Sequence, residues 1–394
     1  MKVVVFHSEL GRLRGGGENF TRNLFTAFAA RGHHVTAVFV ADRHAQYPLP
    51  LPPTITSIPI PGWWSVNIGQ KALASLASYI SPESKGKYIL DRIQQGISWR
   101  NTQWQRHRFQ SRINKEFADR WQRFDAAYVH SNIFLASDIS SHLPTVLRLP
   151  GPVEPEFAPA LRSVHAVCAN GHALTTIRRF LGDHATELPI GIDTQIFKPG
   201  PSAIRSTLGW TSDHRVIGYV GRLTHLKGID LLASAFKQIS LHSTNLRLLI
   251  IGSGTEEVRI RSLLAKELTQ RLVHIEPDVE HRRLVDWYRA MDLCLMPSRY
   301  ENFSNALLEA MACGVPFLAS AIGGNQILAK TGAGWLFAPG SVSSFCGCIN
   351  KILEKWPELK SRGNVGKCYA QKNYDWSASA ERLERLITKH VRAK

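Results

Sequence analysis

The sequence predicts an α/β fold of two domains, each built on a parallel sheet, and three observations support this prediction. The chain has 394 residues, more than a single hydrophobic core usually holds, so two domains of roughly 200 residues each are expected. Short apolar runs typical of buried strands alternate with amphipathic helical patterns. Hydrophobic residues make up 44% of the chain, which is enough to fill two cores.

The composition favours an anionic partner. Lys and Arg number 48 against 31 Asp and Glu, a net charge of +17, which suits a nucleic acid, an acidic polymer or an anionic membrane face. No apolar run approaches the ~18 to 20 residues of a membrane helix. The polar residues that follow Phe6 argue against a signal peptide, so we expect a cytoplasmic protein. The 6 cysteines lack C-x-x-C spacing, which argues against structural zinc.

The first domain is expected to open with a strand at residues 2–6, a glycine-rich turn and a helix at residues 18–30. Three consecutive glycines, residues 15–17, let backbone approach a ligand closely, and a helix start favours an anion. A flexible turn is an equally good interpretation. The next strand begins near residue 35, which completes a β-α-β unit.

The region after this unit changes in composition. Residues 48–61 are rich in proline and predict an extended connection. Residues 85–123 hold ten basic and three acidic side chains, a net +7. Ile113, Phe117 and Trp121 recur every four residues, which predicts a helix with one apolar face. Such a region can lie in a membrane interface or hold an anionic acceptor, or it can be a helical face with solvated arginines.

A strand at residues 125–130 ends in His130, at the carboxyl edge where open α/β sheets bind ligands. His130 is therefore a candidate functional residue, although a structural histidine is the alternative. In the second domain, a strand at residues 216–220 leads into Arg222 and Lys227, followed by a helix at residues 229–239. Two cations at one strand-to-helix turn can both face a diphosphate. The alternative is that they are ordinary surface cations, which would give the same pattern in the sequence.

The most informative stretch is residues 297–316, a polar loop and a helix after a strand at residues 293–296. Ser304 or Asn305 can cap the helix, and the unpaired amides of its first turn favour an anion such as phosphate. Glu301 and Glu309 flank that place and suit hydroxyl pairs, as the acidic residue of dinucleotide folds holds a ribose. Ordinary surface charges are the alternative.

This stretch resembles the donor-site signature of family 4 retaining glycosyltransferases. The resemblance rests on Pro-Ser before Glu301, the aromatic after it, and Leu-Leu-Glu-Ala-Met-Ala-Cys-Gly-Val-Pro. Residues 221–228 are similar to the family's diphosphate clamp, residues 15–18 to its Gly-Gly-x-Glu loop, and residues 125–130 to its Asp-Val-Val-His strand. The resemblance implies the GT-B fold, in which two Rossmann-like domains have parallel sheets facing across a cleft.

The same resemblance implies a separate role for each domain. Residues 1–198 would form an acceptor-binding domain, with the C-terminal helix 377–394 packing back on it. Residues 199–376 would bind a nucleotide-sugar donor. The enzyme would be a retaining glycosyltransferase, and a hexosyltransferase in particular. It would move a sugar from a UDP- or GDP-linked donor to a lipid-linked or polymeric glycan in cell-envelope or exopolysaccharide synthesis. Contact through residues 85–123 would make it peripheral on the inner face of the membrane.

The resemblance also implies roles for single residues, with no cofactor and no metal expected. Arg222, Lys227 and the amides near Ser304 would stabilise the departing diphosphate. The candidate catalytic residues are Arg222, Lys227, Glu301 and His130. The candidate donor-binding residues are Gly16, Gly17, Phe303, Ser304, Asn305, Glu309, Asp278 and Val279.

The sequence departs from the family where Pro150 occupies the place of a usual histidine, which leaves the roles of Pro150 and Arg148 open. The base-contacting glycine near Asp278 is not evident either. Alternative functions are transfer to a soluble small-molecule acceptor, a sugar-nucleotide epimerase or phosphorylase, and a non-catalytic protein that binds nucleotide-sugar or nucleic acid. Nucleic acid is not expected as a partner, because no RNP-like or KH-like motif occurs.

Overall fold

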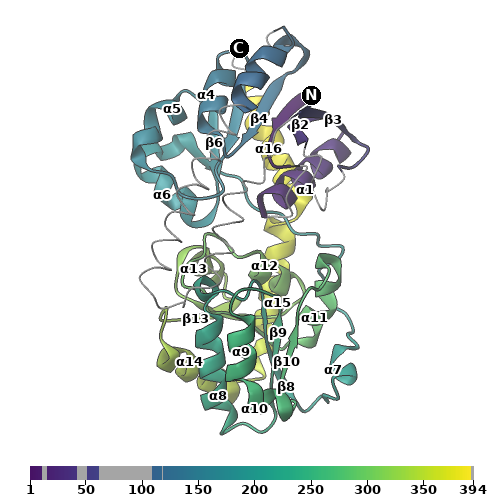
Figure 1. Ribbon diagram of the computed structural model, residues 1–394, viewed down its shortest axis with the longest axis vertical. Helices are drawn as coiled ribbons and strands as arrows, with labels where there is room; N and C mark the ends of the chain where they lie inside the picture. Colours follow the sequence, from purple (N-terminus) through teal and green to yellow (C-terminus); the bar gives the residue numbers. More distant parts are fainter. Residues whose placement is uncertain (11–15, 42–50, 62–108, 118, 392–394) are drawn as a thin grey trace, which may run out of the picture. The chain divides into compact units, whose positions relative to one another are not determined.

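The computed structural model describes residues 1–10, 16–41, 51–61, 109–117 and 119–391. These form two compact units, each a sheet with helices packed around it (Figure 1). The first unit comprises Met1–Cys168, Phe180–Thr186 and Ala380–Lys394, and the second comprises Ala169–Arg179 and Glu187–Ser379. The domain boundary expected at residue 198 therefore falls inside the second unit.

The first unit contains a seven-stranded sheet in the order β3-β2-β1-β4-β5-β6-β7. Its strands are β1 (Lys2–Phe6), β2 (His34–Ala41), β3 (Ile55–Pro61), β4 (Ala126–His130), β5 (Thr145–Arg148), β6 (Ala166–Ala169) and β7 (Ala185–Glu187). Its helices include α1 (Gly16–Ala30), α4 (Ile133–Ser140), α5 (Ala158–Arg162) and α6 (Gly171–Leu181), whose first residues belong to the second unit. β4 is buried along its whole length, as expected of a parallel strand covered on both faces.

The second unit contains a six-stranded parallel sheet in the order β10-β9-β8-β11-β12-β13. Its strands are β8 (Arg215–Val220), β9 (Leu246–Ile251), β10 (Val273–Glu276), β11 (Leu293–Met296), β12 (Phe317–Ser320) and β13 (Gly334–Phe337). Its helices are α7 (Ile204–Thr207), α8 (Ile229–Ser240), α9 (Glu257–Leu263), α10 (Ala265–Thr269), α11 (Leu284–Ala290), α12 (Asn305–Ala312), α13 (Gly323–Ala329), α14 (Val342–Glu354) and α15 (Glu358–Asn373).

The last helix, α16 (Trp376–Val391), starts in the second unit, and its residues from Ala380 on belong to the first. Ala380, Leu383 and Ile387 form its buried face. Glu384 on this helix accepts a hydrogen bond from Arg31, which follows α1, with 2.8 Å between Nε and Oε2. The end of the chain is thereby fixed to the first unit.

The extended segment predicted at residues 48–61 includes a strand that the sequence analysis did not predict. Residues 55–61 form strand β3, which pairs in parallel with β2. Proline lacks a backbone N–H, so the sequence Ile-Pro-Ile-Pro argues against a central strand. β3 is the edge strand of its sheet, where one row of donors needs no partner, and the two prolines are therefore tolerated.

The apolar face predicted after residue 109 is confirmed. Residues 109–117 are helical, and Ile113, Phe117 and Trp121 are all buried. The ring of Phe117 packs edge-on against Phe6 of β1, with 5.4 Å between centroids. The basic residues between 62 and 108 lie outside the described residues, so the membrane-interface interpretation of 85–123 stays a prediction.

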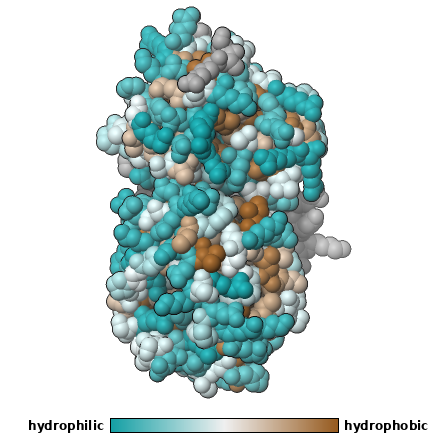
Figure 2. Space-filling model, turned by 180° about the vertical axis from the view of Figure 1, so that it is seen from behind, coloured by the Kyte–Doolittle hydropathy of each residue, from teal (hydrophilic) through white to brown (hydrophobic). Residues whose placement is uncertain are grey.

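The visible surface offers no broad apolar face. Figure 2 shows one side of the molecule, which is mostly hydrophilic with small, separate hydrophobic patches. Among the described residues, no helix has both the length and the apolar character needed to cross a membrane.

Both sheets reverse their strand order at one point, between β1 and β4 in the first unit and between β8 and β11 in the second. In open α/β sheets, ligands bind outside the carboxyl ends of the strands at such a switch point. Each unit therefore has one place where functional residues are expected.

Candidate functional site

Two loops form the switch point of the second unit. One follows β8 and contains Arg222 and the short helix η4 (His225–Lys227), and the other follows β11 and leads into α12. The loops touch at Gly228, whose backbone is left-handed with φ 68°. A Cβ atom at this position would lie 2.0 Å from the carbonyl oxygen of Pro297, so only glycine fits.

Lys227 and Glu301 are brought together across this contact. Lys227 Nζ donates to Glu301 Oε2 at 2.6 Å, and Ser298 Oγ donates to the same oxygen at 3.3 Å. The Glu301 side chain is 10% exposed and that of Lys227 is 22% exposed, so both remain accessible from one side. Lys227, predicted to bind a diphosphate, thus makes a hydrogen bond to Glu301, predicted to accept hydrogen bonds from sugar hydroxyls.

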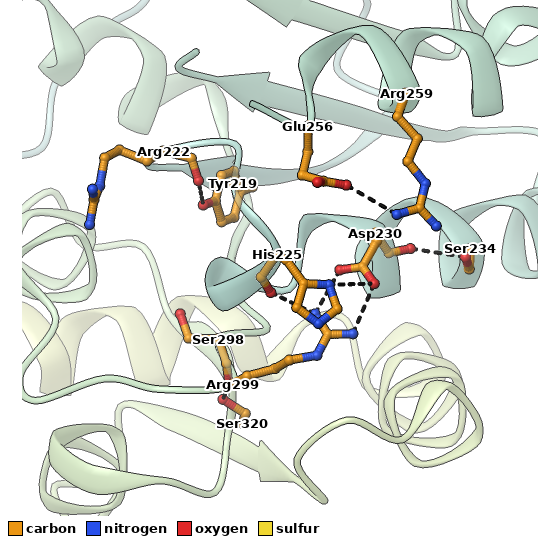
Figure 3. Close-up of polar contacts among 10 residues, drawn as sticks. All are labelled: Tyr219, Arg222, His225, Asp230, Ser234, Glu256, Arg259, Ser298, Arg299 and Ser320. Atoms are coloured by element: carbon orange, nitrogen blue, oxygen red, sulfur yellow. Dashed lines mark hydrogen bonds and ion pairs between the residues drawn. The ribbon is translucent and has the colours of Figure 1, made fainter. Parts of the chain in front are cut away.

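Arg222 has a different environment. Its carbonyl oxygen accepts a hydrogen bond from Tyr219 Oη at 2.8 Å, which fixes the turn after β8. Its exposed side chain extends away from the other residues drawn in Figure 3. Within the described part of the chain, its guanidinium has no hydrogen-bond partner, so its donors are available for a ligand.

A second set of contacts fastens the β11 loop to the β8 loop (Figure 3). Arg299 donates to both carboxylate oxygens of Asp230 at 2.7 and 2.8 Å, and to the carbonyl oxygen of His225 at 2.7 Å. Burial alone would raise the pKa of Asp230, but the hydrogen bonds and charge of Arg299 lower it overall. The sequence analysis did not predict this bidentate pair. The pair joins the loop that carries Glu301 to the segment that follows Lys227.

The start of α12 is built as predicted. Ser304 caps the helix by accepting a hydrogen bond from the Leu307 amide at 3.3 Å. Among the described residues, the amides of Asn305 and Ala306 have no protein acceptor, which leaves donors for an anion. Phe303 is 7% exposed and packs on Tyr374, so its ring belongs to the core.

Asn302 holds the loop from the other side and was missed by the sequence analysis. Its carbonyl oxygen accepts hydrogen bonds from the amides of His172 and Gly324, both at 3.1 Å. Its Oδ1 accepts from the Ala173 amide at 2.8 Å. The first turns of α6 and α13 are thus hydrogen-bonded to Asn302, the residue after Glu301. In the sequence, the double glycine at residues 323–324 was the one signal of this close approach.

Glu309 lies inside α12 and is 6% exposed. Its Oε1 accepts a hydrogen bond from His281 Nε2 at 2.8 Å, and its Oε2 accepts one from Tyr288 Oη at 2.8 Å. The hydrogen bond to Glu309 raises the pKa of His281. Each carboxylate oxygen has a second lone pair, so Glu309 can still accept a ribose hydroxyl.

Asp278 and Val279 follow β10 at the same edge of the sheet. Asp278 has a left-handed backbone with φ 49°, which is uncommon outside glycine and typical of functional loops. Its Oδ1 accepts a hydrogen bond from Ser253 Oγ at 3.4 Å. The Val279 side chain is partly buried against the core. The groups of this turn that could bind a nucleotide base are therefore those of the backbone.

The switch point of the first unit contains two histidines. His7, directly after β1, stacks on His130 at the end of β4 with 4.0 Å between ring centroids. Thr21 Oγ1 lies 2.9 Å from His7 Nδ1 and 3.4 Å from His130 Nδ1. Burial and the charge of Arg148 lower the pKa of His7 to about 3, so His7 is neutral at physiological pH.

Gly17 approaches this pair at the start of α1. A Cβ atom on Gly17 would lie 2.9 Å from His130 Nε2, so the structure brings these two predicted residues together. Gly16 is the first residue of the same helix. Residues 11–15 of the glycine-rich turn lie outside the described residues.

One group in the described part of the chain has metal-ligand geometry. His7, Glu9 and Glu18 each offer a donor atom, and these atoms lie within 4.8 Å of one another. This cluster is where a cation would be sought, whereas the expected absence of a metal at the donor site stays a prediction.

Residues 202–372 match the family model described as Glycosyl transferases group 1. Through this segment the chain is similar to the group 1 glycosyl transferases. The match covers both loops of the second-unit switch point, and with it Arg222, Lys227, Glu301 and Glu309.

The curated relatives reported next are named as glycosyltransferases. D-inositol 3-phosphate glycosyltransferase of Thermobispora bispora is 30% identical over 217 residues, 52% of this chain and 50% of the relative. A GDP-mannose-dependent monoacylated alpha-(1-6)-phosphatidylinositol monomannoside mannosyltransferase of Corynebacterium glutamicum is 29% identical over 233 residues, 55% of this chain and 61% of the relative. The chain spans about half the length of the curated relatives it matches.

Solved structures confirm the predicted fold class of two Rossmann-like units. HepE of Anabaena in complex with UDP superposes with a TM-score of 0.70 at 18% identity, covering 99% of this chain and 100% of that one. At this identity the likeness shows the GT-B fold alone.

Proposed function

We propose that the protein is a retaining glycosyltransferase that transfers a hexose from a nucleotide-diphospho-sugar to an acceptor. The observation that carries this proposal is the set of four side chains at the second-unit switch point. Arg222 and Lys227 supply cations for a diphosphate, and Glu301 and Glu309 supply carboxylates for sugar and ribose hydroxyls.

The reaction breaks the bond between C1 of the sugar and the diphosphate oxygen while an acceptor hydroxyl bonds to C1. Negative charge grows on the leaving oxygen, so fixed donors aimed at it lower the barrier. We propose this role for Arg222, Lys227 and the first amides of α12. The acceptor attacks from the side on which the diphosphate leaves, so the configuration is retained. No covalent intermediate is proposed.

The other predicted residues have supporting roles. Glu301 orients the sugar and holds Lys227 through their 2.6 Å hydrogen bond. His130, in the first unit, is proposed to act near the sugar or the acceptor. Gly17 keeps the first turn of α1 close to His130.

The comparisons support a UDP- or GDP-linked donor, because one relative is named for GDP-mannose and the Anabaena neighbour was solved with UDP. We propose a lipid-linked or polymeric glycan acceptor, supported by the net charge of +17 and by the phosphatidylinositol acceptor in a relative's name. The protein would then work in the cytoplasm, peripherally on the membrane. A soluble acceptor is the second candidate, favoured by the inositol phosphate in another relative's name.

The proposed function can be tested without knowing the acceptor, because a glycosyltransferase slowly transfers its donor sugar to water. Incubation with UDP-glucose, UDP-galactose, GDP-mannose and ADP-glucose should release the nucleotide of one class, measured by chromatography. We expect EDTA to leave this rate unchanged, because Arg222 and Lys227 take the role of a metal. The Glu309→Ala variant is the control. Release that depends on an added divalent metal would contradict the metal-free mechanism, and no release from any donor would contradict the assignment.

A further inference from the structure

Arg148 is the last residue of β5 and lies in the centre of the first-unit sheet. Its Cα atom pairs with His130 on β4 and with Cys168 on β6. The side chain is 3% exposed, and its guanidinium carbon lies 3.6 Å from the centroid of the Phe20 ring on α1. Arg148 therefore reaches the same carboxyl edge as the two stacked histidines.

Among the described residues, the buried guanidinium of Arg148 has no counter-charge, and its Nε and Nη1 atoms have no hydrogen-bond partner. Within the described residues, no carboxylate comes within ion-pair distance of it, and the carboxylate of Glu18 lies beside His7 instead, 3.9 Å from Nε2. Guanidinium stays protonated in proteins and carries five N–H donors, so several donors here are unused.

The groups around Arg148 are neutral. Burial raises the pKa of Cys168 to about 12 and raises that of Tyr128 further above its usual value, so neither carries a negative charge. A buried charge without a partner is strongly destabilising, so an anionic ligand that supplies the missing partner would be stabilising.

We propose that Arg148 receives an oxyanion, a phosphate or a carboxylate, carried by a ligand that binds the first unit at the carboxyl edge of its sheet. The planar fork of guanidinium suits two parallel hydrogen bonds to either group. The Phe20 ring covers one face of the guanidinium, so the hydrogen bonds to the anion would be made from its N–H edge. If the protein is the proposed glycosyltransferase, this ligand is the acceptor of the sugar, and the acceptor is therefore anionic. This last step rests on the proposed function.

The test uses anion binding, which needs no turnover. The full chain carrying Arg222→Ala and Lys227→Ala serves as the parent, so that the second-unit diphosphate site does not contribute. Sodium phosphate and sodium malonate are titrated against sodium chloride at equal ionic strength. The melting temperature and the amide exchange of peptides covering residues 16–24 and 142–149 are measured. Added to the parent, Arg148→Met removes the charge and Arg123→Met is the control, because Arg123 is exposed in the same unit.

We expect phosphate or malonate to raise the melting temperature of the parent and of Arg123→Met by about 2–4 °C and to slow exchange in both peptides. Arg148→Met should lose both effects, and without anion it should melt no lower than the parent, because an unpaired buried charge is removed. A response to phosphate alone assigns a tetrahedral group, and a response to malonate assigns a carboxylate.

Two results would overturn the proposal: an anion response that persists in Arg148→Met, and a parent that responds to neither anion. If Arg148→Met does not fold, Arg148→Lys decides, since it keeps the charge without the fork. Arg148→Lys should respond at several-fold higher anion concentration, and an unchanged response would count against the proposal. Either failure leaves nucleotide release from the donor untouched, so the proposed function is judged separately.

Discussion

Replacing Arg222 by alanine, or Lys227 by methionine, is expected to lower kcat at least tenfold, about 1.4 kcal/mol of transition-state stabilisation. Removal of a single donor to a developing oxyanion often costs on the order of 10² to 10³. Among the described residues, the Arg222 side chain makes no hydrogen bond or ion pair, so its loss should not disturb the fold. Lys227→Met should cost more, because it also leaves the Glu301 carboxylate without its 2.6 Å partner.

The matched control is Arg259→Ala. Arg259 is another cation of the second unit, drawn in Figure 3, whose side chain is 68% exposed and pairs only with Glu256. Rates are measured at saturating donor, with melting temperatures recorded for each variant. A kcat close to that of the wild type in both Arg222→Ala and Lys227→Met would show that these cations do not carry the leaving-group charge.

Replacing Gly228 by alanine is expected to damage the donor site more than the same change at Gly209. Both glycines lie in the second unit with left-handed backbones, φ 68° and φ 70°, so the backbone strain from a Cβ atom is alike, about 1–2 kcal/mol. Their surroundings differ. A Cβ at Gly228 would meet the Pro297 carbonyl oxygen at 2.0 Å, whereas one at Gly209 would meet nothing within 4 Å.

The additional cost at Gly228 should appear in two measurements. Urea denaturation should give a lower free energy of unfolding for Gly228→Ala than for Gly209→Ala, by at least about 1 kcal/mol. Donor turnover should fall at least tenfold in Gly228→Ala, because the loop carrying Glu301 must move away from Lys227. Equal stability and equal turnover in the two variants would mean that the two loops do not depend on this contact.

Local signals were enough to predict the strand, loop and helix around residues 293–312. An apolar run, a capping residue and the glycine that ends the helix, Gly314, all lie between residues 293 and 314, and the structure places β11, the Ser304 cap and α12 accordingly. The strand that ends at His130 was predicted for the same reason. Strand β3 was not predicted, because whether a proline is tolerated in a strand depends on an edge position, which is a property of the whole sheet.

The partners of the predicted residues could not be found in this way. Lys227 and Glu301 are 74 residues apart in sequence, and only the pairing of β8 with β11 brings them together. His281 and Tyr288 reach Glu309 from a different segment that carries no motif. For Arg148, the sequence marked a departure from the family pattern, but burial without a counter-charge is visible only once three strands are assembled.

The most direct test of the central claim is equilibrium binding of UDP, GDP and ADP sugars to the wild-type protein and to Glu309→Ala, measured by isothermal titration calorimetry. If the second-unit switch point is a nucleotide-sugar site, one nucleotide class binds the wild type. Its affinity then falls at least tenfold in Glu309→Ala, because a hydroxyl acceptor is lost next to His281 and Tyr288. Binding that is equally tight in both proteins, or no binding of any class, would contradict the account.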